Sequence, residues 1–274
     1  MATRAVRARG RTICTFEEFT PDVLHNRILR SSLHILRRSP SLSAEVRDDV
    51  ALAYQKLEGI QVMRLSAKLF RQVQLDRNQR FYRFLLGLCE LVHESALVGE
   101  AEGELRFHDF RRDEERMWKV FEDFALEFYR AEQSAFRVAG QQRIRWDLSR
   151  GESSTDHGFL PAMYSDVTLR SDDRRIILDT KFYRRPLTTR YGSEKVRSNN
   201  LYQLLAYLEH REATADAGPR HEGILLYAAV DRSFRFDVEL RGFRLQARTV
   251  DLSRAWGEVR KEMLGVLEHP RENQ

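Results

Sequence analysis

The sequence predicts an α/β protein in which a mixed-sheet core follows an all-α N-terminal module. Apolar residues recur at helical spacing through nearly all of Pro21 to Ser95, whereas helical and strand patterns alternate from Arg116 onward. The polar, charged stretch from Gly99 to Arg112 separates these two regions. We therefore expect a helical module with a basic arm over residues 1–98 and an α/β domain over residues 113–274.

Three helices are predicted in the module. Their apolar positions are Val23, Leu29, Leu33 and Leu36 in the first, residues within Ala44–Leu57 in the second, and Phe81, Phe84, Leu85, Leu88 and Leu91 in the third. The arm before them holds four arginines between Met1 and Arg11 and no apolar run, which argues against a signal peptide or a membrane anchor.

The α/β domain is predicted from alternating periodicities. Its elements, in chain order, are a helix over Glu114–Gln133, a strand near Gln142–Leu148, strands over Met163–Leu169 and Ile176–Tyr183, a helix over Glu194–Arg211, strands over Gly223–Val230, Phe234–Leu240 and Phe243–Val250, and a helix over Ser253–Leu267. The stretch Asp147–Phe159 is rich in Ser, Gly, Asp and Thr and predicts a loop.

Two of these strands each carry a carboxylate, and the polar turn between them predicts a hairpin. Asp166 lies in the first strand, while Asp179 and Lys181 lie in the second. Because side chains alternate along a strand, Asp179 and Lys181 should share a face. Carboxylates inside strands need partners, and a divalent cation is one that suits them. Two oxygen ligands beside an ammonium are what metal-assisted phosphodiester hydrolysis requires, although aspartates near strand ends are also commonplace.

Glu122 is the third acidic candidate. It lies on the predicted Glu114–Gln133 helix with Trp118, Ala125 and Tyr129 as neighbours one turn away, so apolar surface flanks it. A half-buried glutamate needs a cation. That cation is either a metal ion or a nearby arginine, which 46 Lys and Arg residues make readily available.

Gln203 and Tyr207 are four residues apart on the predicted Glu194–Arg211 helix and therefore lie on one helix face. Composition alone predicts a polar pair at the edge of a core. Their position after the hairpin carrying Asp166 and Asp179 makes them candidates for the site.

In this order the motifs resemble the PD-(D/E)xK core of RecB-like nucleases: Asp166, twelve intervening residues, Asp179-Thr180-Lys181, a preceding helical Glu122 and a following Gln203-x-x-x-Tyr207. More closely, the chain resembles the McrC-like nuclease subunits of McrBC modification-dependent restriction systems. The segments that carry this closer resemblance are Phe16–Leu29, Phe121–Phe124, Ser165–Leu169 and Leu178–Tyr183.

The resemblance implies a restriction-endonuclease-like fold and a Mg²⁺-dependent DNA endonuclease, with Mn²⁺ as a substitute ion. Asp166 and Asp179 would bind the metal, the Thr180 carbonyl would complete the shell, and Glu122 would be a ligand or orient a bound water. Lys181 would position the attacking water or stabilise the charge on the phosphate. Gln203 and Tyr207 would support the ligands or touch the scissile strand.

A basic stretch follows the Lys181 strand. Its cations are Arg184, Arg185, Arg190, Lys195 and Arg197. Beside a metal site, such a loop suits a phosphate backbone, and its alternative is a solvated, flexible loop.

The resemblance also implies an AAA+ GTPase of the McrB type as a partner. McrC-like proteins usually carry an extra N-terminal region that docks on this partner, and here only about fifteen residues precede Phe16. Two alternatives therefore stay open: a stand-alone RecB-like repair nuclease or exonuclease, and a non-catalytic, DNA-binding subunit that activates the GTPase. The intact Asp166, Asp179 and Lys181 argue against the second.

Composition predicts a cytoplasmic protein. No apolar run has the length of a membrane span, and 42% hydrophobic residues suffice to fill a core. Cys14 and Cys89 are the only cysteines, which suggests reduced thiols.

Overall fold

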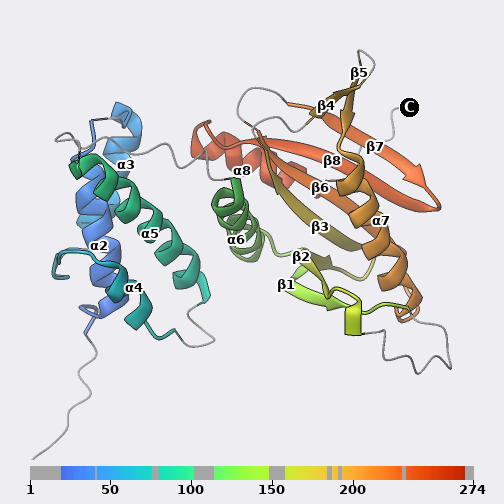
Figure 1. Cartoon of the computed structure of the whole chain (residues 1–274), viewed down its shortest axis with the longest axis horizontal. Helices are drawn as coiled ribbons and strands as arrows, with labels where there is room; N and C mark the ends of the chain where they lie inside the picture. Colours follow the sequence, from blue (N-terminus) through green and yellow to red (C-terminus); the bar gives the residue numbers. More distant parts are fainter. Residues whose placement is uncertain are drawn as a thin grey trace, which may run out of the picture. The chain divides into compact units, whose positions relative to one another are not determined.

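The protein divides into two compact units, Met1–His108 and Asp109–Gln274, in a computed structural model of the chain (Figure 1). The structure describes residues 20–40, 42–75, 80–101, 114–147, 158–183, 187–190, 193–229 and 233–268. The predicted boundary stretch Gly99–Arg112 lies mostly outside these residues. The division between the units falls within it.

The described part of the first unit contains four helices. These helices are α2 (Leu24–Arg37), α3 (Ala44–Lys56), α4 (Ala67–Gln72) and α5 (Arg80–Ala101). Ser43 begins α3 in the way that serine favours, by accepting a hydrogen bond from the Val46 amide at 3.4 Å. A small core of Ile28, Leu65, Leu86 and Cys89 holds the helices together. Burial raises the pKa of the Cys89 thiol to about 11, so this cysteine is an unreactive packing residue.

The second unit is built on a six-stranded mixed sheet in the order β1-β2-β3-β6-β8-β7. Its strands are β1 (Arg137–Ile144), β2 (Met163–Arg170), β3 (Arg175–Phe182), β6 (His221–Ala229), β7 (Arg235–Leu240) and β8 (Phe243–Asp251). Strands β3, β6 and β8 run parallel to one another, whereas β1, β2 and β7 pair antiparallel with their neighbours. This arrangement agrees with the mixed sheet predicted from the sequence.

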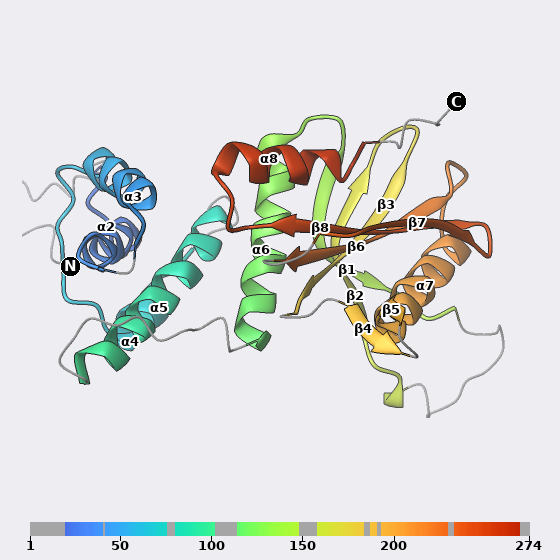
Figure 2. The same cartoon turned by 90° about the horizontal axis from the view of Figure 1, so that it is seen from above.

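Helices cover both faces of the sheet (Figure 2). On one face α6 (Glu114–Glu132) and α8 (Trp256–Gly265) enclose a core that includes Phe121, Tyr129, Leu178 and Met263. On the other face α7 (Ser198–Ala213) packs over a second core that includes Ile177, Leu204 and Leu208. The sheet is thus buried on both sides, which explains why β3 and β6 are almost continuously apolar in sequence.

Two predicted elements differ from the structure. The strand expected near Gln142–Leu148 begins five residues earlier, because this edge strand extends where β2 offers a partner, from Arg137 opposite Arg170 to Ile144 opposite Met163. The helix expected from Glu194 is wrong at its start. Residues Ser193–Val196 form β5, which pairs with β4 (Leu187–Arg190), and α7 begins only at Ser198. The β-branched Thr188, Thr189 and Val196 favour this strand pair.

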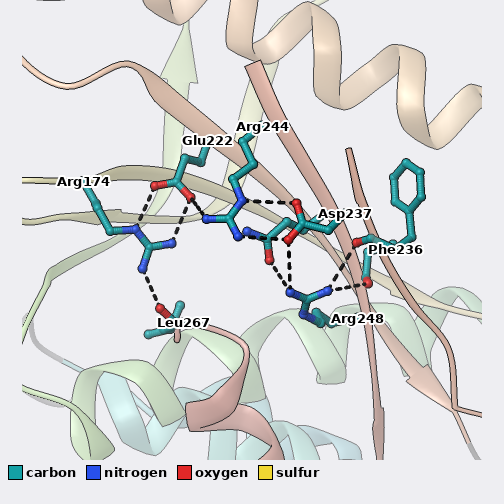
Figure 3. Close-up of polar contacts among 9 residues, drawn as sticks. Arg174, Glu222, Phe236, Asp237, Arg244, Arg248 and Leu267 are labelled. Atoms are coloured by element: carbon teal, nitrogen blue, oxygen red, sulfur yellow. Dashed lines mark hydrogen bonds and ion pairs between the residues drawn. The ribbon is translucent and has the colours of Figure 1, made fainter. Parts of the chain in front are cut away.

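A charged network joins the turn after β2 to the far edge of the sheet (Figure 3). Arg174 donates to both carboxylate oxygens of Glu222, at 2.8 and 2.9 Å. Arg244 then links Glu222, at 3.5 Å, to Asp237, at 2.9 Å, and Arg248 lies 3.7 Å from Asp237. Arg174 and Glu222 are each 8% exposed, so the bidentate pair holds a buried position as a structural connection.

Candidate active site

Strands β2 and β3 form the predicted hairpin and carry its two aspartates. Their ladder runs from Arg170 opposite Arg175 to Val167 opposite Leu178. Beyond that pair, the Asp166 side chain takes the place of a backbone partner. Its Oδ2 accepts hydrogen bonds from the Thr180 amide and the Thr180 hydroxyl, both at 2.7 Å. The carboxylate is therefore fixed at the point where the ladder ends.

Asp179 and Lys181 lie on the same face of β3, as the alternation of the strand predicts. Lys181 Nζ lies 2.5 Å from Asp179 Oδ2 and donates to Gln203 Oε1 at 3.1 Å. Gln203 Nε2 in turn donates to the Tyr207 hydroxyl at 2.7 Å. The structure thus brings the hairpin and both predicted residues of α7 into one connected set.

The two aspartates are strongly desolvated. Asp166 is 8% exposed and Asp179 is 1% exposed. Burial, followed by repulsion from Asp179, raises the pKa of Asp166 to about 6. Burial also raises the pKa of Asp179, although Lys181 acts in the opposite direction. For Lys181, burial opposes the charge, but Asp179 and Asp166 outweigh it and raise the pKa. The site therefore holds more negative charge than its lysine can neutralise.

Glu122 reaches this site from α6. It is 4% exposed, accepts a hydrogen bond from Gln141 Nε2 at 3.0 Å and lies 3.1 Å from Lys119 Nζ. Burial raises the pKa of Glu122, and the charge of Asp166 raises it further. The sequence predicts either a metal ion or an arginine beside Glu122. The cation that the structure places there is Lys119.

The carboxylate oxygens of Asp179 are available to bind a hard cation. Both oxygens of Asp179 are buried and, among the described residues, accept no hydrogen bond of good geometry beyond the ion pair with Lys181. The Thr180 carbonyl already accepts a hydrogen bond from Trp118 Nε1 at 3.0 Å. Within the described ranges, no three His, Cys, Asp or Glu side chains lie close enough to hold a metal ion by themselves. Asp166 and Asp179 are consequently the ligand candidates, and Glu122 lies next to them.

Gln141 belongs to the site although no sequence pattern marks it. It lies where the β1–β2 ladder is interrupted, between the pairs Gly140–Val167 and Gln142–Ser165. Its φ of 49° is a left-handed conformation that is uncommon for a residue other than glycine. Its side chain holds Glu122 at the distance given above. Local backbone strain of this kind is often found at functional sites. The sequence indicates this backbone irregularity only through the Gly140-Gln141-Gln142 run, which is unusual for a strand interior.

Asn200 is a second residue that the sequence does not reveal. Its Nδ2 donates to the Tyr227 hydroxyl at 2.9 Å, and its Oδ1 accepts from the Tyr183 hydroxyl at 3.3 Å. Asn200 thereby fixes the first turn of α7 against the strands that carry the site.

The predicted DNA-binding stretch is partly described. Arg184 and Arg185 lie outside the described residues, and Arg190 ends β4. Lys195 is exposed on β5, and the Arg197 guanidinium stacks on the Tyr183 ring at 4.4 Å. A cavity next to them is lined by Tyr183, Thr188, Lys195, Val196, Arg197, Ser198, Asn199 and Asn200. The described part of this stretch is therefore a β-hairpin, which corrects the expected loop.

Comparisons with known proteins place this chain in a family. The profile of the McrBC 5-methylcytosine restriction system component family matches residues 2–228. The chain is 32% identical over 259 residues to the type IV methyl-directed restriction enzyme EcoKMcrBC of Escherichia coli (strain K12), covering 94% of this chain and 73% of that protein. The chain belongs to the McrBC 5-methylcytosine restriction system component family. The predicted McrC-like resemblance is thereby confirmed.

A solved structure also resembles the chain. It is the refined half-complex from the tetradecameric assembly of Thermococcus gammatolerans McrB AAA+ hexamers with bound McrC, at 20% identity and a TM-score of 0.40. The match covers 91% of this chain, which spans about half (53%) of the length of that chain. Separately, no helix in the described part of the chain is long and apolar enough to cross a membrane.

Proposed function

We propose that this protein is the metal-dependent DNA endonuclease subunit of a McrBC-type restriction system, with a PD-(D/E)xK site on a restriction-endonuclease-like core. The observation that carries the proposal is the position of the three residues at the end of the β2–β3 ladder, where Asp166 is bonded to Thr180 and Lys181 is paired with Asp179. Family membership adds a restriction system as the setting, and the resemblance adds an AAA+ GTPase of the McrB type as the partner.

The proposed ion is Mg²⁺, with Mn²⁺ as a substitute, because buried carboxylates are hard oxygen ligands. Asp166 and Asp179 would hold it, and a bound ion supplies Lewis-acid stabilisation of a phosphoryl oxygen. Thr180 fixes the orientation of Asp166 through its amide and hydroxyl. These two hydrogen bonds leave the Asp166 Oδ1 atom as the free ligand position.

Lys181 is the proposed electrostatic residue. Gln203 and Asp179 hold its ammonium on the same face as the aspartates, where it would orient the attacking water or offset charge on the phosphate. Tyr207 holds Gln203 and is therefore a positioning residue in this proposal. Glu122, kept in place by Gln141, would orient a bound water or act as a further ligand.

The test combines cleavage with direct metal binding. The full chain is assayed with and without the AAA+ GTPase on DNA that contains 5-methylcytosine, in Mg²⁺ and in EDTA, and Mn²⁺ binding is measured by calorimetry. Asp179→Asn is expected to lose both metal binding and cleavage, whereas Lys181→Ala should keep the metal and lose cleavage by roughly a hundredfold or more. Asp173→Asn and Lys261→Ala are matched exposed controls that should change neither.

Two results would overturn the proposal. Cleavage that persists in EDTA contradicts the metal assignment, and equal loss of metal affinity in both variants makes Lys181 a structural residue. Cleavage at full rate without the GTPase would leave the site intact but remove the proposed partner.

A further inference from the structure

A second basic cavity lies at the opposite end of α7 from Lys181. It is formed by β1, β2, the start of β3, the end of α7 and the segment that follows α7. We call it the arginine pocket. Its lining includes Arg137, Thr168, Arg170, Arg175, Arg211 and Thr214. One acidic side chain, Asp216, is part of the described lining, so four guanidinium groups face one carboxylate.

The arginines of this pocket are poorly compensated. Arg137 and Arg170 are paired directly across the β1–β2 ladder, an arrangement that repels like charges, and neither has an ion-pair partner among the described residues. Arg211 donates to Gln142 Oε1 at 2.6 Å, a neutral partner. Arg175 is 5% exposed and donates to two backbone carbonyls, while its Nε is buried with no partner in the described part of the chain.

The positive charge of the pocket also affects the pKa of His221, which is part of the lining. Burial lowers the pKa of His221, and Arg175 and Arg211 lower it further, although Glu212 acts in the opposite direction from 2.6 Å. The imidazole is therefore held neutral beside the arginines. A concentration of positive charge with an unused buried donor is what an oxyanion would satisfy.

The arginine pocket shares a face of the sheet with the proposed catalytic site. Thr168 is paired with Ile177, which belongs to the core under α7, and residues Asp166, Thr168 and Arg170 alternate onto that face. Four residues of strand at about 3.3 Å each place Arg170 roughly 13 Å from Asp166.

Helix α7 gives the same separation independently. Gln203, Tyr207 and Arg211 succeed one another at four-residue steps along one helix face. Eight residues at about 1.5 Å each place Arg211 roughly 12 Å from Gln203. Neighbouring phosphates of one DNA strand lie further apart than the axial rise of about 3.4 Å, because the backbone winds around the axis, so this distance spans only a few nucleotides.

We propose that the arginine pocket binds a backbone phosphate of the DNA substrate, a few nucleotides from the scissile phosphate. This inference rests on the proposed nuclease function. The pocket would set the register of the strand along α7, between Arg211 at one end and Lys181 at the other, without reading bases.

The test measures binding and not cleavage. In the full-length Asp179→Asn background, DNA affinity is followed by fluorescence anisotropy over a range of salt concentrations. The double variant Arg137→Gln/Arg170→Gln is expected to bind roughly tenfold more weakly at low salt, and its slope of log K against log salt should be smaller by about 1. Arg137→Lys/Arg170→Lys keeps the charges and should retain most of the slope. Arg260→Gln, an exposed arginine of α8 on the opposite sheet face, should leave the slope unchanged.

An unchanged slope in the double Gln variant would overturn the inference. A thermal shift with inorganic phosphate separates the two sources of phosphate: if free phosphate stabilises the wild type through this pocket while the DNA slope stays constant, the site binds a free anion and the DNA assignment is wrong. Because binding is measured without cleavage, failure of the nuclease proposal would appear in the metal-binding and cleavage assays and not here.

Discussion

Asp166→Asn is expected to stabilise the metal-free protein at pH 7.5, although it removes a residue proposed as a ligand. Glu122, Asp166 and Asp179 place three carboxylates beside Lys181 and Lys119. Removing the charge of Asp166 balances this cluster, and the amide oxygen of asparagine can still accept the hydrogen bond from the Thr180 amide. The pKa of Asp166 rises from 3.8 to about 6, and a difference of about 2 units corresponds to about 3 kcal/mol. Since Asp179 shares the repulsion, we expect a gain of about 1–3 kcal/mol.

The sign of this effect can be followed through pH. The folded-state pKa of Asp166 is raised above its unfolded value, so the folded state binds the proton more tightly. The stability that this proton contributes is complete below about 3.8 and is lost as the pH rises through about 6. The advantage of Asp166→Asn should therefore be small near pH 4 and grow to its full value above pH 6.

Urea denaturation in EDTA measures this difference. The three tryptophans, Trp118, Trp146 and Trp256, all lie in the second unit, so their fluorescence reports the unfolding of the unit that contains the site. Asp173→Asn, on the exposed turn between β2 and β3, is the control for a lost aspartate charge. A variant that is less stable than the wild type at pH 7.5, or a gap of equal size at pH 4 and pH 7.5, would refute this electrostatic reasoning.

Three further changes test the packing around the site. Gly140→Ala should destabilise the second unit by about 1–3 kcal/mol in thermal denaturation, because the new Cβ would overlap the Leu126 side chain. An unchanged melting temperature would mean that Leu126 and α6 shift without cost. Arg174→Gln should lose about 2–4 kcal/mol in urea denaturation, because it removes the bidentate partner of the buried Glu222 and leaves only the longer contact with Arg244. A loss below 1 kcal/mol would mean that Arg244 or solvent compensates the carboxylate. Gln141→Gly should relieve the left-handed backbone and yet slow cleavage, so stability and rate should change in opposite directions; a parallel loss of both would assign Gln141 a purely structural role.

The strands and helices around the hairpin were predictable because their patterns are local. Met163–Leu169 and Ile176–Tyr183 alternate or run apolar between polar turns, and β2 and β3 occupy nearly these residues. The face shared by Asp179 and Lys181 follows from strand geometry alone, and the 2.5 Å contact confirms it.

What the sequence could not supply depends on contacts between distant segments. The limits of β1 are set by β2 about thirty residues later, and its apolar pattern is weak because it is an edge strand. Gln141 and Trp118 reach the site through an unusual backbone angle and a helix packed on the sheet, neither of which leaves a periodic trace. The pair β4–β5 was hidden by polar residues that suit an exposed hairpin as well as a loop.

The proposed function depends on which positive charge balances the carboxylates of Asp166, Asp179 and Glu122. Asp166 and Asp179 are too buried to stay ionised together at no cost, and Lys181 alone cannot neutralise both of them together with Glu122. The excess negative charge of these three carboxylates can be neutralised by binding a proton or by binding a metal cation. A proton would leave Asp166 a weak ligand below about pH 6, whereas a divalent ion would displace it and keep both aspartates charged. Metal binding should therefore release about half a proton at pH 6, where Asp166 is half protonated, and almost none at pH 8. Calorimetry in buffers of different ionisation enthalpy measures this proton release. Equal proton release at both pH values would mean that the ion does not bind at Asp166.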